Sequence, residues 1–476
     1  MSDGVLIPLW LALLAGALAL WFVLDRLLLP SARWYIRSRA AKAMADVGQR
    51  LRFHVRPFQQ ISRQALIDRL IFDDKVQQAT QAYADERGMP REVALEQVQR
   101  YAREIVPAFN AYVYFRVGYW LGKRISQALY RVRIGYTDDA GLEAIPKDAT
   151  VVFVMNHRSN MDYIVASYLA AERAALSYAV GEWAQVLGLQ QLIRAMGAYF
   201  VRRNSKDELY RRVLERYIAM ATEAGVTQAV YPEGGLTKDG ALREPRFGVI
   251  DYMLRGYHHG GERDLVFVPL GLNYDRVLED RTQLRSGDAA TPRVGRQQAA
   301  WRTLGFVGNQ LGLLLRSRWH RFGYACVNFG TPVSVREWTA KRGIVLAELP
   351  RERRQAEVAA LGRLLMEQVG QLIPVLPVPL VATLMVADLQ RARSAFEIKA
   401  EVGALVQQLQ VRGARLYLPR QDWDYAVDAG LRMLVQRHLV DEAAGLFTPR
   451  AAEAPLLRYY ANSIAHLVRQ PPAMAA

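Results

Sequence analysis

A chain of 476 residues with 51% hydrophobic and 23% charged residues can bury one large core or two to three moderate ones, which argues against a disordered protein. Its single cysteine, Cys326, excludes an internal disulfide framework and a cysteine-rich metal site, and it is interpreted as a small buried hydrophobe. The net charge of +16 indicates an anionic partner: nucleic acid, anionic lipid headgroups, or a phosphorylated or CoA-type substrate.

An uncharged apolar run opens the sequence. Residues 5–24 contain no charged side chain, and a helix of 20 residues rises about 30 Å, the thickness of the hydrocarbon core of a bilayer. Only Asp3 precedes the run and basic residues follow it from Arg26 on, so an uncleaved membrane anchor over residues 1–30 is favoured over a cleaved signal peptide. The positive-inside rule then predicts that the rest of the chain lies in the cytoplasm, at the inner membrane if the protein is bacterial.

The next region, residues 31–140, is predicted to be basic and mainly helical. Its stretch 113–134 alternates apolar clusters with arginine and lysine. This pattern is typical of a helix that lies among lipid headgroups or packs its apolar face on a core. The stretch carries too many charges for another membrane span. We therefore interpret residues 31–140 as a helical, membrane-proximal region.

The pattern changes near Gly141, where short apolar runs begin to alternate with helical segments. Residues 150–155 form a β-branched run of the kind that becomes a buried strand. This alternation predicts an α/β domain over residues 141–340, and residues 341–476 are predicted to be mainly helical again. Further strands are expected at residues 198–201, 228–231, 265–270 and 324–329.

Polar residues follow the first two of these runs. His157 and Asp162 come after the first run and can act as a base and its orienting carboxylate, if the segment between them is a loop that enters a helix. Taken alone, the pair is more typical of an unrelated surface histidine and a helix-capping aspartate. Arg202 and Arg203 end the second run, where guanidinium groups suit a phosphate or form a solvated basic turn.

Two more polar blocks follow the later runs. The block at residues 231–240 has two adjacent glycines, whose backbone can approach a ligand closely and whose N–H groups suit a phosphate or a developing oxyanion. A plain loop is the structural alternative. The block at residues 268–276 is an apolar strand with a polar end. The candidate residues in these two blocks are Glu233, Gly234, Gly235, Lys238 and Arg276.

Together and in this order, the four blocks resemble the motifs of the glycerolipid acyltransferases. The resemblance is closest to the glycerol-3-phosphate and dihydroxyacetone-phosphate acyltransferase branch, whose HRSxxD block is similar to residues 157–162. Residues 374–386 and 457–467 are similar to C-terminal segments of the same branch, so the resemblance runs from about residue 110 to the end of the sequence. The run 374–386 is too short for a straight membrane span and is expected to complete a core or line a tunnel.

The resemblance implies an α/β fold, with a central mixed sheet flanked by helices. It implies transfer of a fatty acyl group from acyl-CoA or acyl carrier protein to the sn-1 hydroxyl of glycerol 3-phosphate, giving lysophosphatidate, with His157 and Asp162 as catalytic residues. No metal or other cofactor is expected, because the seven histidines show no ligand spacing. It assigns the acceptor phosphate to Arg202, Arg203, Lys238 and Arg276, and substrate positioning or the oxyanion to Glu233, Gly234 and Gly235.

Two positions depart from the family pattern. Leu236 stands where the family usually has an arginine that grips the acceptor phosphate, which keeps lysophosphatidate and dihydroxyacetone phosphate open as acceptors. Asn160 stands where a histidine is common. A non-catalytic, membrane-attached lipid-binding module is the alternative from a different class. Nucleic-acid binding is a more distant alternative, because the basic residues are spread along the chain and form no recognisable reader.

Overall fold

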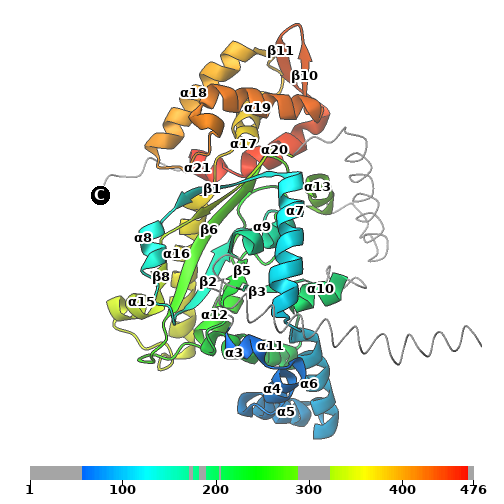
Figure 1. Cartoon of the computed structure of the whole chain (residues 1–476), viewed down its shortest axis with the longest axis vertical. Coiled ribbons are helices and arrows are strands. Elements are labelled where there is room, and N and C mark those ends of the chain that lie inside the picture. The colour runs from blue at the N-terminus through cyan, green and yellow to red at the C-terminus, as the bar shows by residue number, and fades with distance from the viewer. Residues whose placement is uncertain (1–55, 171–174, 182–188, 203–204, 288–321, 470–476) are drawn as a thin grey trace, which may run out of the picture. The chain divides into compact units, whose positions relative to one another are not determined.

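A mixed sheet with the strand order β1-β7-β6-β2-β5-β3-β4, and with β8 paired to β6, organises the computed structural model (Figure 1). The structure describes residues 56–170, 175–181, 189–202, 205–287 and 322–469. These residues belong to one compact unit, Val55–Ala476. The predicted membrane anchor, residues 1–30, lies outside the described residues.

The sheet is mixed because β1, β7 and β8 run against the other strands. Strands β6, β2, β5, β3 and β4 are mutually parallel, β7 is antiparallel to β6, and β1 is parallel to β7. The carboxyl ends of β2, β5 and β6 therefore meet at one edge of the sheet. The strands are β1 (Arg131–Thr137), β2 (Thr150–Met155), β3 (Ser177–Val180), β4 (Tyr199–Phe200), β5 (Gln228–Val230), β6 (Leu265–Tyr274), β7 (Tyr324–Phe329) and β8 (Val333–Ser334).

Helices occupy the connections and the C-terminal region. Up to β7 they are α3 (Pro57–Gln60), α4 (Arg63–Ile71), α5 (Asp74–Arg87), α6 (Arg91–Ile105), the π-helical η2 (Val113–Gly118), α7 (Tyr119–Leu129), α8 (Asp139–Glu143), α9 (Met161–Ala170), α10 (Leu189–Ala195), α11 (Glu208–Glu223), α12 (Gly248–Leu254) and α13 (Asp280–Gly287). After β8 they are α15 (Val335–Arg342), α16 (Arg351–Leu372), α17 (Pro377–Ala387), α18 (Ala395–Val411), α19 (Trp423–Gln436), α20 (Ala454–Asn462) and α21 (Ala465–Arg469).

Most strands lie close to their predicted positions. The runs predicted at 150–155 and 324–329 coincide with β2 and β7, and the run at 265–270 extends to Tyr274 as the fully buried β6. The prediction was wrong for the end of the 113–134 stretch, because α7 ends at Leu129 and β1 follows it. The backbone N–H and C=O groups of β1 are paired with those of β7, which lies far along the chain. The local sequence pattern around β1 does not show this partner.

Hydrophobic cores form on both faces of the sheet, because successive residues of a strand point to opposite sides. On β2, Val152 and Val154 belong to one core, which α4, α6, α11, α12 and α16 help to build. Met155 belongs to the other core, together with residues of α9, α17, α18, α19 and α20. The α/β class with helices flanking a central mixed sheet is thus confirmed.

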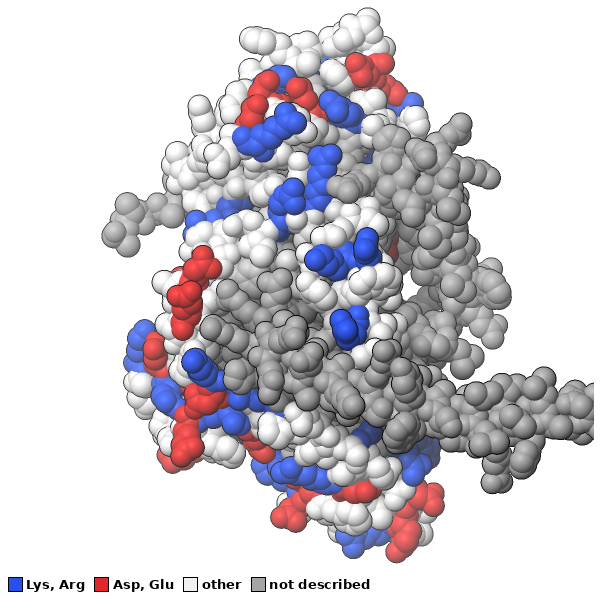
Figure 2. Space-filling model, in the orientation of Figure 1, with Lys and Arg blue, Asp and Glu red and all other residues white. Residues whose placement is uncertain are grey.

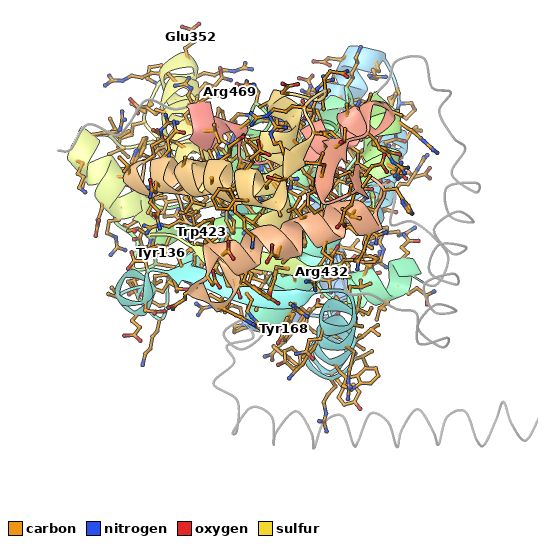
Figure 3. All side chains as sticks on the ribbon, turned by 90° about the horizontal axis from the view of Figure 1, so that it is seen from above. Tyr136, Tyr168, Glu352, Trp423, Arg432 and Arg469 are labelled. Carbon is orange, nitrogen blue, oxygen red and sulfur yellow. The ribbon has the colours of Figure 1, made fainter. Side chains whose placement is uncertain are left out.

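The C-terminal helices pack on the second core. The apolar run that was expected to complete a core contains α17, whose Val378, Val381 and Met385 are buried there. Ser394 and Glu397 form a capping box that starts α18. Figure 3 looks down on α18 and α19. A small sheet in the order β10-β11-β9 completes the region, with β9 (Arg393–Ser394), β10 (Val440–Ala443) and β11 (Leu446–Pro449).

Helix α7 packs beside α9, the helix that follows β2. Tyr119 of α7 and Tyr168 of α9 lie with their ring centroids 5.8 Å apart. Tyr168 is labelled in Figure 3. Within the described ranges, no helix combines the length and hydrophobicity that a membrane crossing needs.

Substitution of Gly271 tests the tight contact between β6 and the end of α16. A Cβ atom added at Gly271 would lie 2.3 Å from the backbone of Leu372, so Gly271→Ala must displace main chain. We expect a loss of about 1–3 kcal/mol in the free energy of unfolding, measured by denaturant titration. Gly403→Ala on α18 is the control, because its Cβ would meet only the Trp423 ring at 3.4 Å. The control should be neutral or stabilising by about 0.5–1 kcal/mol.

Candidate active site

The turn between β2 and α9 brings His157 and Asp162 into contact. His157 Nδ1 lies 2.9 Å from Asp162 Oδ2, and both side chains are buried. The same oxygen accepts the backbone N–H groups of Arg158 and Ser159 at 2.7 and 3.0 Å. The other oxygen, Oδ1, accepts the Tyr274 hydroxyl at 2.7 Å. Because the residues between the pair form a loop, their five-residue spacing does not separate them as it would on a helix.

Tyrosine rings surround the His157 imidazole. The ring of Tyr231 lies over it with centroids 4.3 Å apart, and Tyr163 Oη is 3.4 Å from His157 Nε2. Burial raises the pKa of Tyr231 well above its ordinary value, so this phenol stays neutral at physiological pH. With Nδ1–H donated to Asp162, Nε2 carries the lone pair and can accept a proton.

Glu233 braces the backbone of His157. Its Oε1 accepts the His157 N–H at 2.7 Å and its Oε2 accepts the Arg243 N–H at 3.0 Å. The His157 carbonyl accepts the Thr237 N–H at 3.1 Å, so the loop after β5 holds His157 on both sides of its main chain. Burial raises the pKa of Glu233 to about 7.

The two predicted glycines differ in their surroundings. Gly234 has φ +66° and is exposed, and its N–H donates to the Tyr231 carbonyl at 3.0 Å within a turn. Gly235 is buried beside it. Lys238 is exposed, while the guanidinium of Arg243 turns back to the Leu236 carbonyl at 3.3 Å. Of this loop, Glu233 is the predicted residue in direct contact with the His157 turn.

The predicted Arg202 is engaged elsewhere on the sheet edge. Its Nε donates to Glu104 at 2.8 Å, and its guanidinium lies 5.0 Å from the Tyr101 ring centroid. The bond to Glu104 raises the pKa of Arg202. It follows β4, which is three strand positions from β2, or about 14 Å at about 4.8 Å per strand. Arg203 lies outside the described residues.

Arg276 stands just after the carboxyl end of a strand adjacent to β2. It follows β6, which pairs directly with β2, and its guanidinium lies 3.9 Å from the centroid of the Phe322 ring. Burial, together with the charge of Arg437, lowers the pKa of Arg276. Among the described residues no hydrogen bond from this guanidinium is found, so its donors can serve a ligand.

Among the residues that contact the turn and were not predicted as site residues are Tyr274, Glu279 and Tyr459. Tyr274 binds Asp162, as described above. Glu279 accepts the Ser159 hydroxyl at 2.8 Å and the Asn160 N–H at 3.1 Å. Tyr459 of α20 lies against Arg158. Tyr274 and Tyr459 stood inside blocks that the sequence singled out, but no signal in those blocks assigned them a contact.

Comparisons with known proteins cover most of the chain. Residues 137–273 match the profile of the acyltransferase family, and residues 310–476 match the glycerol-3-phosphate acyltransferase C-terminal region. A glycerol-3-phosphate acyltransferase of Xanthomonas campestris is 28% identical over 283 residues, which are 59% of this chain and 31% of that protein. One of Pseudomonas putida is 25% identical over 440 residues, 87% of this chain and 50% of that protein. The chain thus spans half or less of these curated relatives.

Solved structures were also matched. The 1-acyl-sn-glycerophosphate acyltransferase of Thermotoga maritima is 17% identical, with a TM-score of 0.31, over 53% of this chain and 78% of that one.

Glu233→Gln tests the pH dependence that a buried carboxyl imposes on folding. The pKa of Glu233 is about 7 in the folded chain, against an ordinary value of 4.5. Between these values the folded state holds a proton that the unfolded state has lost, so this carboxyl lowers the free energy of unfolding as pH rises. Glutamine does not titrate. In denaturant titrations, the wild type should therefore lose stability relative to E233Q from about pH 4.5 to about 7. A stability difference between the wild type and E233Q that stays constant over this pH range would contradict the raised pKa of Glu233.

Proposed function

We propose that this chain, which belongs to the glycerolipid acyltransferase superfamily and to its glycerol-3-phosphate acyltransferase branch, transfers a fatty acyl group to the sn-1 hydroxyl of glycerol 3-phosphate. The donor is the thioester of acyl-CoA or acyl carrier protein, and the product is lysophosphatidate. The contact between His157 and Asp162 carries the proposal, because it lies within the region that matches the acyltransferase profile. The names of the matched relatives and the C-terminal match support the choice of acceptor.

His157 is the proposed general base. The acceptor hydroxyl oxygen attacks the thioester carbonyl carbon while its proton passes to His157 Nε2. The C–S bond then breaks, and the imidazolium returns the proton to the departing thiolate. Asp162 holds the tautomer and stabilises the imidazolium. The thioester supplies an activated acyl group, so the proposed reaction uses neither a metal nor another cofactor.

Arg276 is the proposed main ligand of the acceptor phosphate. Its place just after β6, the strand that pairs with β2, and its unused donors support this role. Lys238, Arg202 and Arg203 remain proposed contributors, although the bond from Arg202 to Glu104 must give way before that guanidinium can serve a phosphate. Gly235 is the better proposed oxyanion donor of the two glycines, because the Gly234 N–H is used in a turn. Glu233 is proposed to position His157 through its backbone.

We also propose that the enzyme works at a membrane, held by the apolar segment at residues 1–30 with its catalytic part in the cytoplasm. Basic side chains support this location. On the face that Figure 2 shows, several basic side chains lie on the upper middle of the described surface with few acidic ones beside them, while basic and acidic side chains are mixed toward both ends. Trp120 of α7 is 58% exposed, and an exposed indole near basic residues suits a lipid headgroup layer.

Replacement of the proposed base tests the catalytic assignment. His157→Ala should lower acyl transfer in isolated membranes by about 10²–10⁴-fold, because it removes general-base catalysis. The exposed His259 is the matched control, and His259→Ala should keep wild-type turnover. Both variants should be present in the membrane fraction in equal amounts. Near-wild-type turnover of H157A would eliminate His157 as the base, and a wild type inactive with every acyl donor would favour the lipid-binding module.

An acceptor panel tests the substrate. Wild-type membranes should acylate glycerol 3-phosphate faster than dihydroxyacetone phosphate or lysophosphatidate. Arg276→Ala should raise KM for glycerol 3-phosphate about tenfold or more with little change in kcat, because a phosphate ligand binds ground and transition states alike. Arg432→Ala, at an exposed position on α19, is the control and should leave KM unchanged. A preference for lysophosphatidate would make this a second-step enzyme instead.

A further inference from the structure

Arg158 is a buried cation that the proposed mechanism does not use. Its side chain is 3% exposed, and Nη1 donates to the Gly240 carbonyl at 2.5 Å. Nε and Nη2 are buried without a hydrogen-bond partner among the described residues. A buried guanidinium with one hydrogen bond depends on its remaining contacts. One of these is the ring of Tyr459, whose centroid lies 5.3 Å from the Arg158 Cζ.

Tyr459 also reaches the main chain of Arg158. Its hydroxyl donates to Gln283 Oε1 at 2.7 Å, and Gln283 Nε2 donates to the Arg158 carbonyl at 3.2 Å. The contacts close a ring that holds Arg158 by its guanidinium and by its carbonyl. We call the four residues Arg158, Gly240, Gln283 and Tyr459 the Arg158 clamp.

The clamp rests on a close backbone contact. Gly240 has φ +86°, and a Cβ there would lie 1.8 Å from the Tyr459 carbonyl oxygen, so the loop after β5 touches α20 directly. Helix α20 therefore has a defined position from which Tyr459 can act on the turn.

We infer that Tyr459 is a positioning residue, through which the C-terminal helix α20 sets the geometry of the His157 turn. The link is the backbone of Arg158, whose N–H donates to Asp162 Oδ2 while its side chain and carbonyl lie in the clamp. The same Oδ2 faces His157 Nδ1. A shift of Arg158 moves the donor that aligns the carboxylate. The role of this alignment in turnover rests on the proposed function.

Tyr459→Phe tests the inference, because it keeps the ring beneath Arg158 and removes the bond to Gln283. In membranes that contain the full chain, kcat should fall about tenfold while KM for donor and acceptor stays within about twofold. Tyr459→Leu also removes the ring and should lower kcat by about a hundredfold. Tyr460→Phe is the matched control: it is equally buried, on the same helix, and loses its own bonds, but its hydroxyl contacts no residue of 157–162 in the described structure. Its kcat per folded protein should equal the wild-type value.

Hydrogen exchange gives a readout that does not need turnover. The N–H groups of Arg158 and Ser159, which donate to Asp162, should exchange faster in Tyr459→Phe than in the wild type, and Tyr460→Phe should leave them protected. If Tyr459→Phe exchanges faster than the wild type but the wild type acylates no acceptor, the clamp stands and the proposed function fails. Wild-type kcat and exchange in Y459F would overturn the inference. The inference would also be overturned if Y459F and Y460F lost the same share of activity and that loss equalled the loss of folded protein in each variant.

Discussion

The carboxylate of Asp162 is the group on which the rest of the site depends. It is fully buried, and it is stabilised by four donors: the imidazole of His157, two backbone N–H groups of the turn, and the hydroxyl of Tyr274. Asp162 also lies in the first turn of α9, where the helix dipole favours a negative charge. Because Tyr274 ends β6 and the turn follows β2, one carboxylate fixes the imidazole and joins the ends of two neighbouring strands.

Two further acidic residues hold the same short turn. Glu233 accepts the backbone N–H of His157, and Glu279 accepts the hydroxyl of Ser159 and the N–H of Asn160. Burial raises the pKa of both residues, and bonds to the turn oppose that rise. The turn is therefore held by side chains from two separate loops, those that follow β5 and β6. An imidazole held in this way needs little reorganisation when it accepts a proton, which is the physical basis of a preorganised site.

The sequence predicted the parts of this arrangement that local pattern encodes. Strands β2 and β7 were predicted because apolar runs bounded by polar residues are typical of buried strands, and the pairing of His157 with Asp162 was suggested by the order of the blocks. Strand β1 was missed because its partner β7 lies far along the chain. The bond between Arg202 and Glu104, and the contacts of Glu279 and Tyr459 with the turn, arise when separate helices pack against the sheet edge. No local pattern records such packing.

The distance along the chain between β1 and β7, and between Arg158 and Tyr459, has a consequence for biosynthesis. While the ribosome is still translating the region after residue 322, β1 has no strand to pair with, and the apolar surface that α17 later covers is open to solvent. Long-range pairings of this kind form late, and incomplete chains with unpaired edges aggregate readily. The turn at residues 157–162 therefore acquires its contact with Tyr459 only after α20 has been synthesised.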